Sequence, residues 1–340
     1  MKKDSPLTKD GLSRLNGDPT DEQLLEMYRQ MVLCRALDER VWLLNRQGKA
    51  AIVASAQGHE AAQIGSVAAL RKGHDHFFIY YRDLAVLLSL GLTPTQIMSG
   101  FLAKTGEPLS DARQFPTHGA DQDLKIVNLS NVVGTQIPQA VGNALASKMR
   151  GGDNVTIVYF GDGAASVGDC HEGMNFAAIH KLPVIFFCEN NKYAISVPLS
   201  KQMAIESIAS RAEGYGMPGI VVDGTDITAV YEATSEASKR ARGGGGPTLI
   251  EAMVERYLPH TSDDDDTRYR PSEDIENARK HDPLSMLKEY LFASGIVDDQ
   301  IEETFVSDTK KSINEATEKV EAAQHPDTSS FYKHVYASTM

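Results

Sequence analysis

A lone carboxylate, Asp162, stands between two glycines in the stretch YFGDGAASVGDC, directly after an apolar run. Twenty-six residues separate Gly163 from the pair Asn190 and Asn191, which follows a second apolar run. Aspartate and asparagine supply hard oxygen ligands, and a backbone carbonyl from the turn after Asn191 could supply a third, which suits Mg²⁺. The small residues after Asp162 are predicted to open a helix, whose free N–H groups attract phosphate. The pattern therefore predicts a diphosphate bridged to the protein by a metal ion.

Strands and helices that alternate from Gln136 onward would bring these residues together. Strands are expected at 155–160, 183–188, 219–222 and 247–254, and helices at 136–152, 169–181, 200–212 and 226–246. This alternation predicts an α/β fold, a doubly wound and mostly parallel sheet with helices on both faces. Ligands of such sheets bind at the carboxyl ends of the strands, where Asp162 and Asn191 would emerge side by side.

Helical segments are expected at both ends of the chain. Thr20 has the sequence of an N-cap with Gln23 three residues later, and apolar residues at helical spacing lead to a stop at Gly48. A second helix, an aromatic strand and a long loop rich in Gly and Pro are expected at 59–73, 76–83 and 104–123, with a short helix that ends near Gly91 before the loop. We expect one structural domain made of an N-terminal helical segment, an α/β core and a C-terminal helical extension, at 1–75, 76–270 and 271–340.

The overall composition excludes several classes of protein. The 340 residues carry 34 basic and 46 acidic side chains, a net charge of −12, which disfavours nonspecific binding to nucleic acid or to an anionic membrane. Cys34, Cys170 and Cys188 show neither disulfide nor zinc spacing, which indicates a reducing compartment. No apolar stretch is long enough to span a membrane, and the first twenty residues resemble neither a secretory signal nor a transit peptide. These features predict a cytoplasmic protein.

The GDG motif, the 26-residue spacing and the NN pair resemble the thiamine-diphosphate-binding motif. The surrounding stretch GDGAASVGDCHEGMNFAAIHKLPVIFFCENNKYAISVP is similar to alpha subunits of the decarboxylase components of 2-oxo acid dehydrogenase complexes, above all the bacterial branched-chain members. The likeness continues through YYRD, TQIPQAVG, EGYGMPGIVVDG and PHTSDDDDTRYR, and covers roughly Thr20 to Leu291.

The resemblance implies roles for individual residues. Mg²⁺ would be held by Asp162, the side chain of Asn191 and the main-chain carbonyl of Tyr193. The cofactor would contact Tyr81, Arg82, Asn131, Val133, Gly163, Ala164, Asn191 and His260, of which His260 would also reach the reacting centre as the catalytic residue. A monovalent cation, K⁺, would be held by Ser130, Val132, Thr135 and Gln136. The substrate pocket would include Tyr80 and His118.

Several of these residues have simpler interpretations. Arg82 could form a surface ion pair with Asp83, Tyr80 could be an ordinary core aromatic, and His260 could be a solvated loop histidine. The chain also departs from the family at two positions. Some branched-chain relatives have arginine where this chain has Glu189, which removes one expected phosphate contact, and some have serine where it has Asn131.

The implied activity is the decarboxylation of branched-chain 2-oxo acids such as 3-methyl-2-oxobutanoate, followed by acyl transfer to the lipoyl group of a transacylase core. The cofactor's aminopyrimidine must be activated by a glutamate, which in this family comes from a separate beta subunit of an α₂β₂ heterotetramer. Two alternatives stay open. One is an alpha subunit for pyruvate or acetoin, and the other is a non-catalytic binding protein that has kept the fold.

Overall fold

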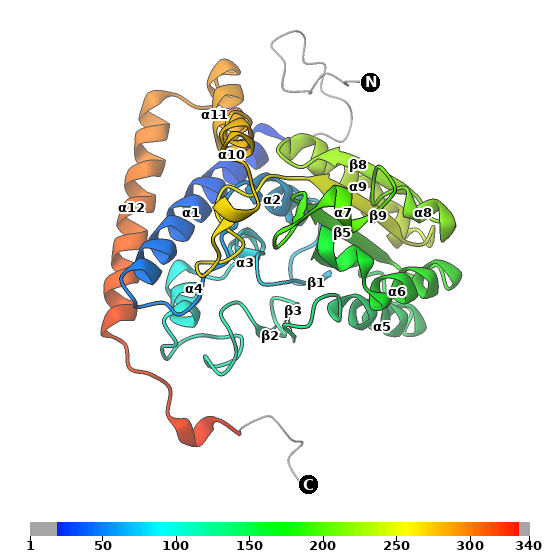
Figure 1. Cartoon of the computed structure of the whole chain (residues 1–340), viewed down its shortest axis with the longest axis horizontal. Helices are drawn as coiled ribbons and strands as arrows, with labels where there is room; N and C mark the ends of the chain where they lie inside the picture. The colour runs from blue at the N-terminus through cyan, green and yellow to red at the C-terminus, as the bar shows by residue number, and fades with distance from the viewer. Residues whose placement is uncertain (1–18, 129, 333–340) are drawn as a thin grey trace.

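A twisted sheet of seven strands forms the centre of the structure, a computed structural model that describes residues 19–128 and 130–332 (Figure 1). The strand order is β2-β3-β1-β4-β5-β9-β8, and only β2 runs antiparallel to its neighbour. The strands are β1 (His76–Phe78), β2 (Gly119–Asp121), β3 (Ile126–Asn128), β4 (Thr156–Gly161), β5 (Val184–Asn190), β8 (Gly219–Asp223) and β9 (Thr248–Met253). The strand order changes direction between β1 and β4. The predicted α/β fold, a doubly wound and mostly parallel sheet, is confirmed.

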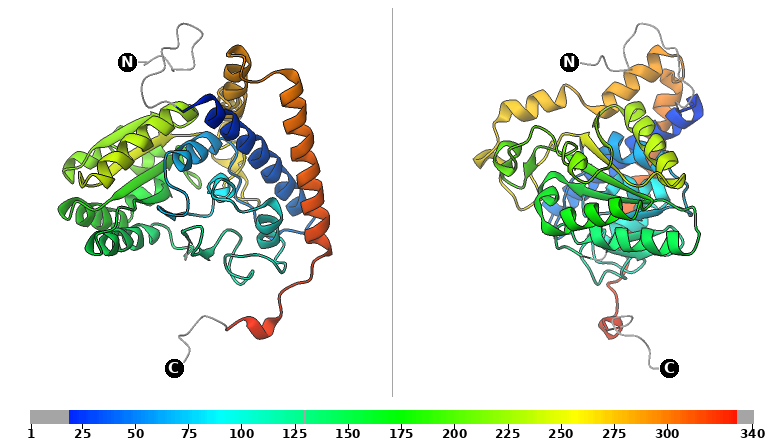
Figure 2. Two further views of the ribbon diagram at one scale, coloured as in Figure 1. Left: turned by 180° about the vertical axis from the view of Figure 1, so that it is seen from behind. Right: turned by 90° about the vertical axis from the view of Figure 1, so that its right-hand side faces the viewer.

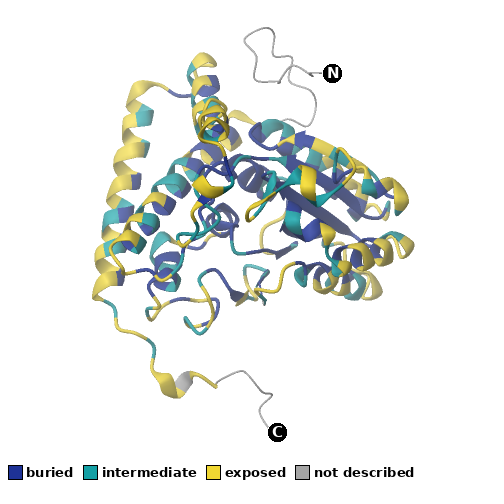
Figure 3. Ribbon diagram, viewed as in Figure 1, coloured by how far each residue is buried: buried dark blue, intermediate teal, exposed yellow. Residues whose placement is uncertain are grey.

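Helices cover both faces of the sheet because its central strands are apolar on both sides. Every residue of β5 is buried. Ile185 and Phe187 point into a core shared with α2 (Glu60–Ala68) and α9 (Ile227–Arg242). Val184 and Phe186 point into a second core under α5 (Gln136–Met149) and α6 (Gly168–Ile179). Figure 3 shows the sheet as the most deeply buried part of the chain.

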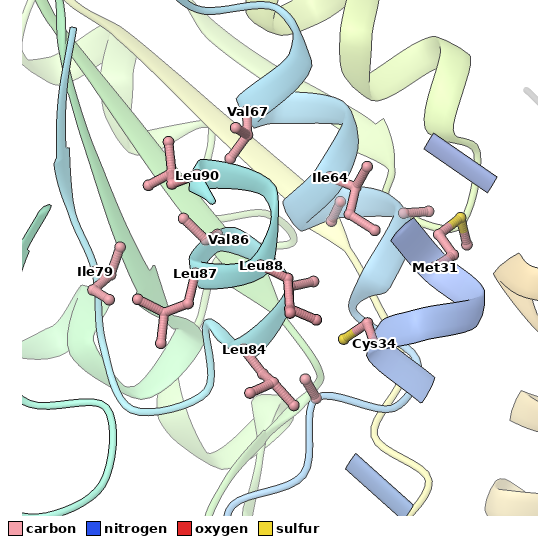
Figure 4. Packing of buried hydrophobic residues seen from close by; sticks show 14 of the residues in the cluster. Met31, Cys34, Ile64, Val67, Ile79, Leu84, Val86, Leu87, Leu88 and Leu90 are labelled. Atoms are coloured by element: carbon pink, nitrogen blue, oxygen red, sulfur yellow. The ribbon is translucent and has the colours of Figure 1, made fainter. Parts of the chain in front are cut away.

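A helical layer flanks the sheet on the side of α2. The long helix α1 (Asp21–Arg46) lies between α2 and α12 (Asp299–Ala322), which runs along the edge of the molecule (Figure 2). Figure 4 shows Met31 and Cys34 of α1 near Ile64 of α2 and the leucines of α3. The remaining helices of this layer are α3 (Leu84–Leu90), α4 (Pro94–Phe101) and α11 (Pro283–Ala293). The mostly exposed helix α10 (Ser272–Arg279) precedes α11 in the chain.

The expected helix over 20–48 is confirmed with its capping box, since Thr20 Oγ1 accepts from the Gln23 amide and Gln23 Oε1 accepts from the Thr20 amide. The helix expected over 59–73 is shorter and ends at Ala68. The short helix before Gly91 is also confirmed, and Gly91 has the left-handed φ of +112° that ends it.

The helix expected over 200–212 is wrong. The segment instead contains two single turns, α7 (Leu199–Gln202) and α8 (Arg211–Gly214), with extended backbone at Met203 between them. The buried Glu251 carboxylate accepts from the Ala209 amide at 2.8 Å and so takes the donor that a continuous helix would use. A tertiary contact therefore overrides the local helical pattern.

The helix start expected at Gly163 is also wrong in detail. Asp162–Ser166 form a short 3₁₀ turn, η1, and extended Val167 separates this turn from α6. Val167 packs close to Gly134, where an added Cβ would lie 2.4 Å from the valine side chain. The turn after β4 therefore belongs to the edge of the sheet and not to the following helix.

Smaller differences concern the strands. The aromatic strand expected over 76–83 is limited to β1, because Tyr80 and the residues after it turn away at the sheet edge. The loop expected over 104–123 contains β2, which pairs with β3. A hairpin of β6 (Tyr193–Ala194) and β7 (Val197–Pro198) follows β5, where the sequence predicted no strand. None of the helices within the described ranges has the length and apolar character needed to cross a bilayer.

The central strand β5 offers a test of this packing. Phe187 is fully buried and its ring lies 5.3 Å from the Tyr159 ring on β4. Phe187→Ala should lower the free energy of unfolding by about 3–5 kcal/mol, because it leaves a cavity in the core. Val221→Ala on the exposed side of β8 is the matched control and should change it by less than about 1 kcal/mol. Urea denaturation measures both, and equal effects would contradict this account of the core.

Candidate active site

A cavity of about 570 Å³ opens at the carboxyl ends of β1, β4, β5 and β9, where the chain order of the sheet changes direction. Nearly every residue predicted to belong to the site lines it. Those residues are Tyr80, Tyr81, Arg82, His118, Ser130, Asn131, Val132, Val133, Gln136, Asp162, Gly163, Ala164, Asn191, Tyr193 and His260. Thr135 is the exception, and its hydroxyl donates to the Val132 carbonyl at 2.9 Å. The sheet topology thus gathers residues that are up to 180 positions apart in the sequence.

Asp162 is almost completely buried at the start of η1, with 3% of its surface exposed. Gln202 Nε2, from α7, donates to Asp162 Oδ2 at 2.6 Å and to the Val197 carbonyl at 2.9 Å. Burial raises the pKa of the Asp162 carboxyl above its ordinary value, while the Gln202 hydrogen bond acts to lower it. A cation beside this carboxylate would relieve the cost of its burial. No motif in the sequence predicted that Gln202 would contact Asp162.

The two asparagines have different surroundings. Asn190 lies inside β5, where its amide donates to Glu251 Oε1 at 2.7 Å and its side-chain oxygen accepts from the Lys192 amide at 2.9 Å. Asn191 follows the strand and lines the cavity with Asp162. Because β4 and β5 pair with Gly161 opposite Glu189, both strands deliver a polar side chain to the same edge. The expected convergence of Asp162 and Asn191 is confirmed.

The chain turns sharply after Asn191. Lys192 and Ile195 have positive φ values of 73° and 53°, which are rare for residues with side chains and are frequent at binding sites. The Tyr193 ring between them is held by the guanidinium groups of Arg270 and Arg256, at 5.4 and 5.9 Å from its centroid. Tyr193 lines the cavity together with Asp162 and Asn191.

Arg82 is buried, with 1% of its surface exposed, so the alternative of a surface ion pair with Asp83 is wrong. Arg82 Nη1 donates to the Ser55 carbonyl at 2.7 Å, and Nη2 donates to the His260 carbonyl at 3.1 Å and contacts His260 Nδ1 at 3.2 Å. The Ser55 turn is itself held by Asp38 of α1, whose carboxylate accepts from Ser55 Oγ and the Ala56 amide, both at 2.7 Å. A buried acid on the first helix therefore supports the arginine at the cavity.

His260 is a partly buried wall of the cavity and not a solvated loop histidine. Burial lowers the pKa of its imidazole to about 3, and the positive charges of Arg82 and Arg256 act in the same direction. The ring is therefore neutral near pH 7. Since Nδ1 faces the Arg82 donor, the proton is assigned to Nε2, which leaves one N–H free to donate to a ligand oxygen.

Positive charge gathers behind His260. Arg256 is buried, and its Nε and Nη1 have no hydrogen-bond partner among the described residues. Burial lowers the pKa of Arg256, and its neighbours Arg82 and Arg270 lower it further. Asp264 offsets part of this charge, but the buried donors Nε and Nη1 of Arg256 stay unpaired within the described part of the chain, so this end of the cavity is suited to an anion.

The remaining walls come from two loops. His118 is buried, and its Nδ1 donates to the Pro116 carbonyl at 2.9 Å, so the loop expected over 104–123 does reach the cavity. Glu107 holds this loop together by accepting from the amides of Leu109 and Ser110 at 2.7 Å. Ile52, Phe101 and Phe115 add an apolar surface that no sequence motif predicted.

Glu189 is fully buried inside β5 and does not line the cavity. Its Oε2 accepts from His59 Nδ1 at 2.6 Å and from the Tyr80 hydroxyl at 3.0 Å. Tyr80 is therefore a cavity residue with a polar anchor, and not an ordinary core aromatic. His59 was missed because it lies 130 residues from its partner.

The donor set at the cavity fits Mg²⁺ better than a transition metal. Within the described residues, no group of three His, Cys, Asp or Glu side chains is placed to hold a metal. Asp162, Asn191 and the Tyr193 carbonyl offer one carboxylate, one amide and one backbone oxygen, all hard ligands, and leave positions for water and ligand phosphate.

The neutral state of His260 can be tested through stability. In the unfolded chain its pKa lies near 6.5, whereas in the folded chain it is about 3, so the unfolded state binds more protons below pH 6.5. Acidification from pH 7 to pH 5 should therefore lower the free energy of unfolding of the wild-type protein, because the His260 imidazole takes up a proton only in the unfolded state. The variant His260→Gln should lack this contribution to the decrease. Unfolding free energies at the two pH values measure the difference. An identical pH dependence in both proteins would show that His260 titrates normally.

Comparisons with known proteins agree with this geometry. Residues 28–329 match the family described as Dehydrogenase E1 component. The chain is 50% identical over 318 residues to the 2-oxoisovalerate dehydrogenase subunit alpha of Bacillus subtilis, which covers 94% of this chain and 96% of that protein.

Two further relatives are similar over most of the chain. It is 39% identical to the mitochondrial 2-oxoisovalerate dehydrogenase subunit alpha of Mus musculus, over 93% of this chain and 71% of that one. It is 41% identical to the pyruvate dehydrogenase E1 component subunit alpha of Staphylococcus aureus, over 94% and 84%. The chain belongs to the dehydrogenase E1 component family, whose members depend on thiamine diphosphate.

Proposed function

We propose that this chain is the alpha subunit of a 2-oxo acid dehydrogenase that acts on branched-chain 2-oxo acids such as 3-methyl-2-oxobutanoate. The observation that carries the proposal is the convergence of Asp162 and Asn191 at one end of a cavity that also holds buried arginines and a neutral histidine. The similarity to two 2-oxoisovalerate dehydrogenase alpha subunits supports the branched-chain substrate. Pyruvate is the second candidate because a pyruvate dehydrogenase alpha subunit is 41% identical.

The metal would be Mg²⁺, held by Asp162, the Asn191 side chain and the Tyr193 carbonyl. Asp162 Oδ2 is occupied by Gln202, so Oδ1 is the oxygen that remains for the metal. The diphosphate would lie against η1, near Gly163 and Ala164, with Tyr81 and Arg82 on its other side. The small residues of η1 let a phosphate come close to the backbone. K⁺ bound by Ser130, Val132, Thr135 and Gln136 would order the adjacent loop.

When bound, thiamine diphosphate supplies the carbon nucleophile for the 2-oxo group and the electron sink on which carbon dioxide leaves. The chain's own residues bind and orient. Neutral His260 would donate its Nε2 proton in a hydrogen bond to an oxygen of substrate or phosphate, and Arg82 fixes the opposite ring nitrogen. Because the pKa of His260 is about 3, this hydrogen-bonding state does not change near neutral pH.

The substrate pocket would lie between Tyr80 and His118. Ile52, Phe101 and Phe115 supply apolar surface that a branched alkyl chain can bury and that a methyl group would leave unfilled. The Tyr80 hydroxyl is held by Glu189, so this wall keeps a fixed position.

The partner would be a beta subunit in an α₂β₂ heterotetramer, which works with a lipoyl transacylase core. Asp162 is the one carboxylate among the described residues that line the cavity, which supports another chain as the source of the glutamate that activates the cofactor. Val132, Val133 and Ile195 line the cavity yet are 65%, 53% and 54% exposed. Exposed apolar side chains grouped at a cavity are typical of a surface that a partner covers.

Free, buried cysteines and the acidic composition accord with a cytoplasmic location.

A reconstitution experiment tests the proposed function. The purified chain alone should release no detectable CO₂ from 3-methyl-2-oxobutanoate, and co-expression with its beta subunit should restore release in the presence of thiamine diphosphate and Mg²⁺. We expect kcat/KM for 3-methyl-2-oxobutanoate to exceed that for pyruvate by about tenfold or more, because even one additional methyl-sized group in an apolar pocket changes kcat/KM by about tenfold or more. Activity of the chain alone would contradict the shared site. A preference for pyruvate would replace the branched-chain assignment.

Asp162→Ala tests the metal site. The variant should lose Mg²⁺-dependent binding of thiamine diphosphate by the heterotetramer, measured by calorimetry. Its melting temperature without metal should stay equal to or above that of the wild type, because the substitution removes a buried carboxylate whose pKa is raised. Asp308→Ala, an exposed carboxylate on α12, is the matched control. Unchanged cofactor affinity in Asp162→Ala would remove this residue as a metal ligand.

A further inference from the structure

A group of buried polar side chains lies next to the candidate metal site and outside the cavity lining, apart from Tyr80. We call it the Glu189 network, and its members are His59, Gln63, Tyr80, Asp83 and Glu189. Four of them are completely inaccessible to solvent, with exposed fractions of 0% for His59, Gln63, Asp83 and Glu189. A polar cluster of this size is costly to bury unless its groups satisfy one another.

Glu189 is the centre of the network. Its Oε2 accepts from His59 Nδ1 at 2.6 Å, from Tyr80 Oη at 3.0 Å and from Gln63 Nε2 at 3.1 Å. Gln63 is itself fixed, because its Oε1 accepts from the Ala85 amide at 3.0 Å. Asp83 lies at the edge of the network, where its Oδ2 accepts from the Tyr80 amide at 2.8 Å and its Oδ1 accepts from Gln63 Nε2 at 3.3 Å.

The contact with Glu189 determines the state of His59. Nδ1 must carry a proton, since the atom 2.6 Å away is a carboxylate oxygen. The other ring nitrogen, Nε2, lies 3.5 Å from Asn191 Nδ2, a long contact in which the amide donates and the ring accepts. Asn191 Oδ1 is thereby left on the other side of the amide, where it accepts only from the Tyr193 amide at 3.3 Å.

A glycine brings His59 to this position. Gly58 has a φ of +92°, and a Cβ there would lie 2.3 Å from the carbonyl oxygen of Glu255, two residues after β9. Only a residue without a side chain allows this approach. The close passage places His59, the first residue before α2, beneath the carboxyl end of β5.

We propose that His59, held by Glu189, is a positioning residue that fixes the Asn191 amide with its oxygen directed at the metal. The inference rests on the proposed function, because it needs the Mg²⁺ site at Asp162 and Asn191. An asparagine amide can rotate by half a turn and present its NH₂ group, which cannot bind a cation. The acceptor nitrogen of His59 stabilises one of the two orientations.

The role of Glu189 in holding His59 explains why a carboxylate occupies this position, which the sequence alone did not show. Where arginine in some relatives is expected to reach a phosphate, this chain has a carboxylate that points to His59. The two ligands of the metal site would then be oriented by separate partners, Asp162 by Gln202 and Asn191 by His59. Outer partners of this kind change metal affinity by about 10- to 100-fold when they are removed.

The test measures the Mg²⁺ concentration that half-saturates binding of thiamine diphosphate to the heterotetramer, by calorimetry, with the melting temperature without metal as a second readout. His59→Leu should raise this concentration about tenfold or more, because Asn191 loses its acceptor. His59→Gln should stay within about threefold of the wild type, since its amide can donate to Glu189 or accept from Asn191 at similar reach. If His59→Leu does not fold, His59→Asn has the same expectation, because its shorter side chain cannot span Glu189 and Asn191.

Ser66→Ala is the matched control. Ser66 is as deeply buried as His59 and lies on the adjacent helix α2, where its hydroxyl bonds to the Gln63 carbonyl and the Tyr159 hydroxyl without touching Glu189 or Asn191, so the Mg²⁺ requirement should remain that of the wild type. Half-saturation unchanged in His59→Leu or His59→Asn would overturn the proposal, and so would a Ser66→Ala variant that needs as much additional Mg²⁺ as His59→Leu. A wild-type heterotetramer that binds the cofactor without Mg²⁺ would instead overturn the proposed function, and this inference with it.

Discussion

The parallel pairing of β4 with β5 is the constraint on which the rest of the site depends. Six consecutive residue pairs fix the register, and Gly161 lies opposite Glu189. A slip of one residue would turn every side chain of the strand to the other face, so the two apolar cores under α2 and α5 hold this register firmly. Asp162 and Asn191 therefore leave the sheet at the same edge and line the same cavity.

Burial makes these two oxygens useful and also makes them costly. Asp162 and Asn191 are 3% and 5% exposed, and each needs a neighbour to satisfy it before a cation is bound. Gln202 donates a hydrogen bond to Asp162, and His59 of the Glu189 network accepts from the Asn191 amide. The cavity also has a cationic part, since Arg82 lines it beside neutral His260 and the buried Arg256 acts on the same histidine. A cavity with an oxygen-rich side and a cationic side is suited to a metal with an attached anion.

Sequence patterns predict the parts of this structure that local spacing controls. Alternating apolar strands and helices predicted β4, β5, β8 and β9 with their carboxyl-end residues, and the Thr20 capping box predicted α1. The family resemblance, rather than spacing, pointed to Arg82 and His260. The rest depends on contacts between distant residues. Glu251 breaks the expected helix over 200–212 by taking the Ala209 amide, and His59 meets Glu189 only because Gly58 lets two backbones approach.

An apolar cavity wall that stays exposed has an energetic consequence for the single chain. Val132, Val133 and Ile195 gain nothing from burial until another surface covers them, and each such side chain contributes about 1.5–3 kcal/mol when it is fully buried. A partner that covers this wall and a cofactor that binds beneath it would both favour the same arrangement of residues 130–136 and 191–195. By linkage, each would then increase the affinity for the other, so subunit association and cofactor binding should be coupled thermodynamically.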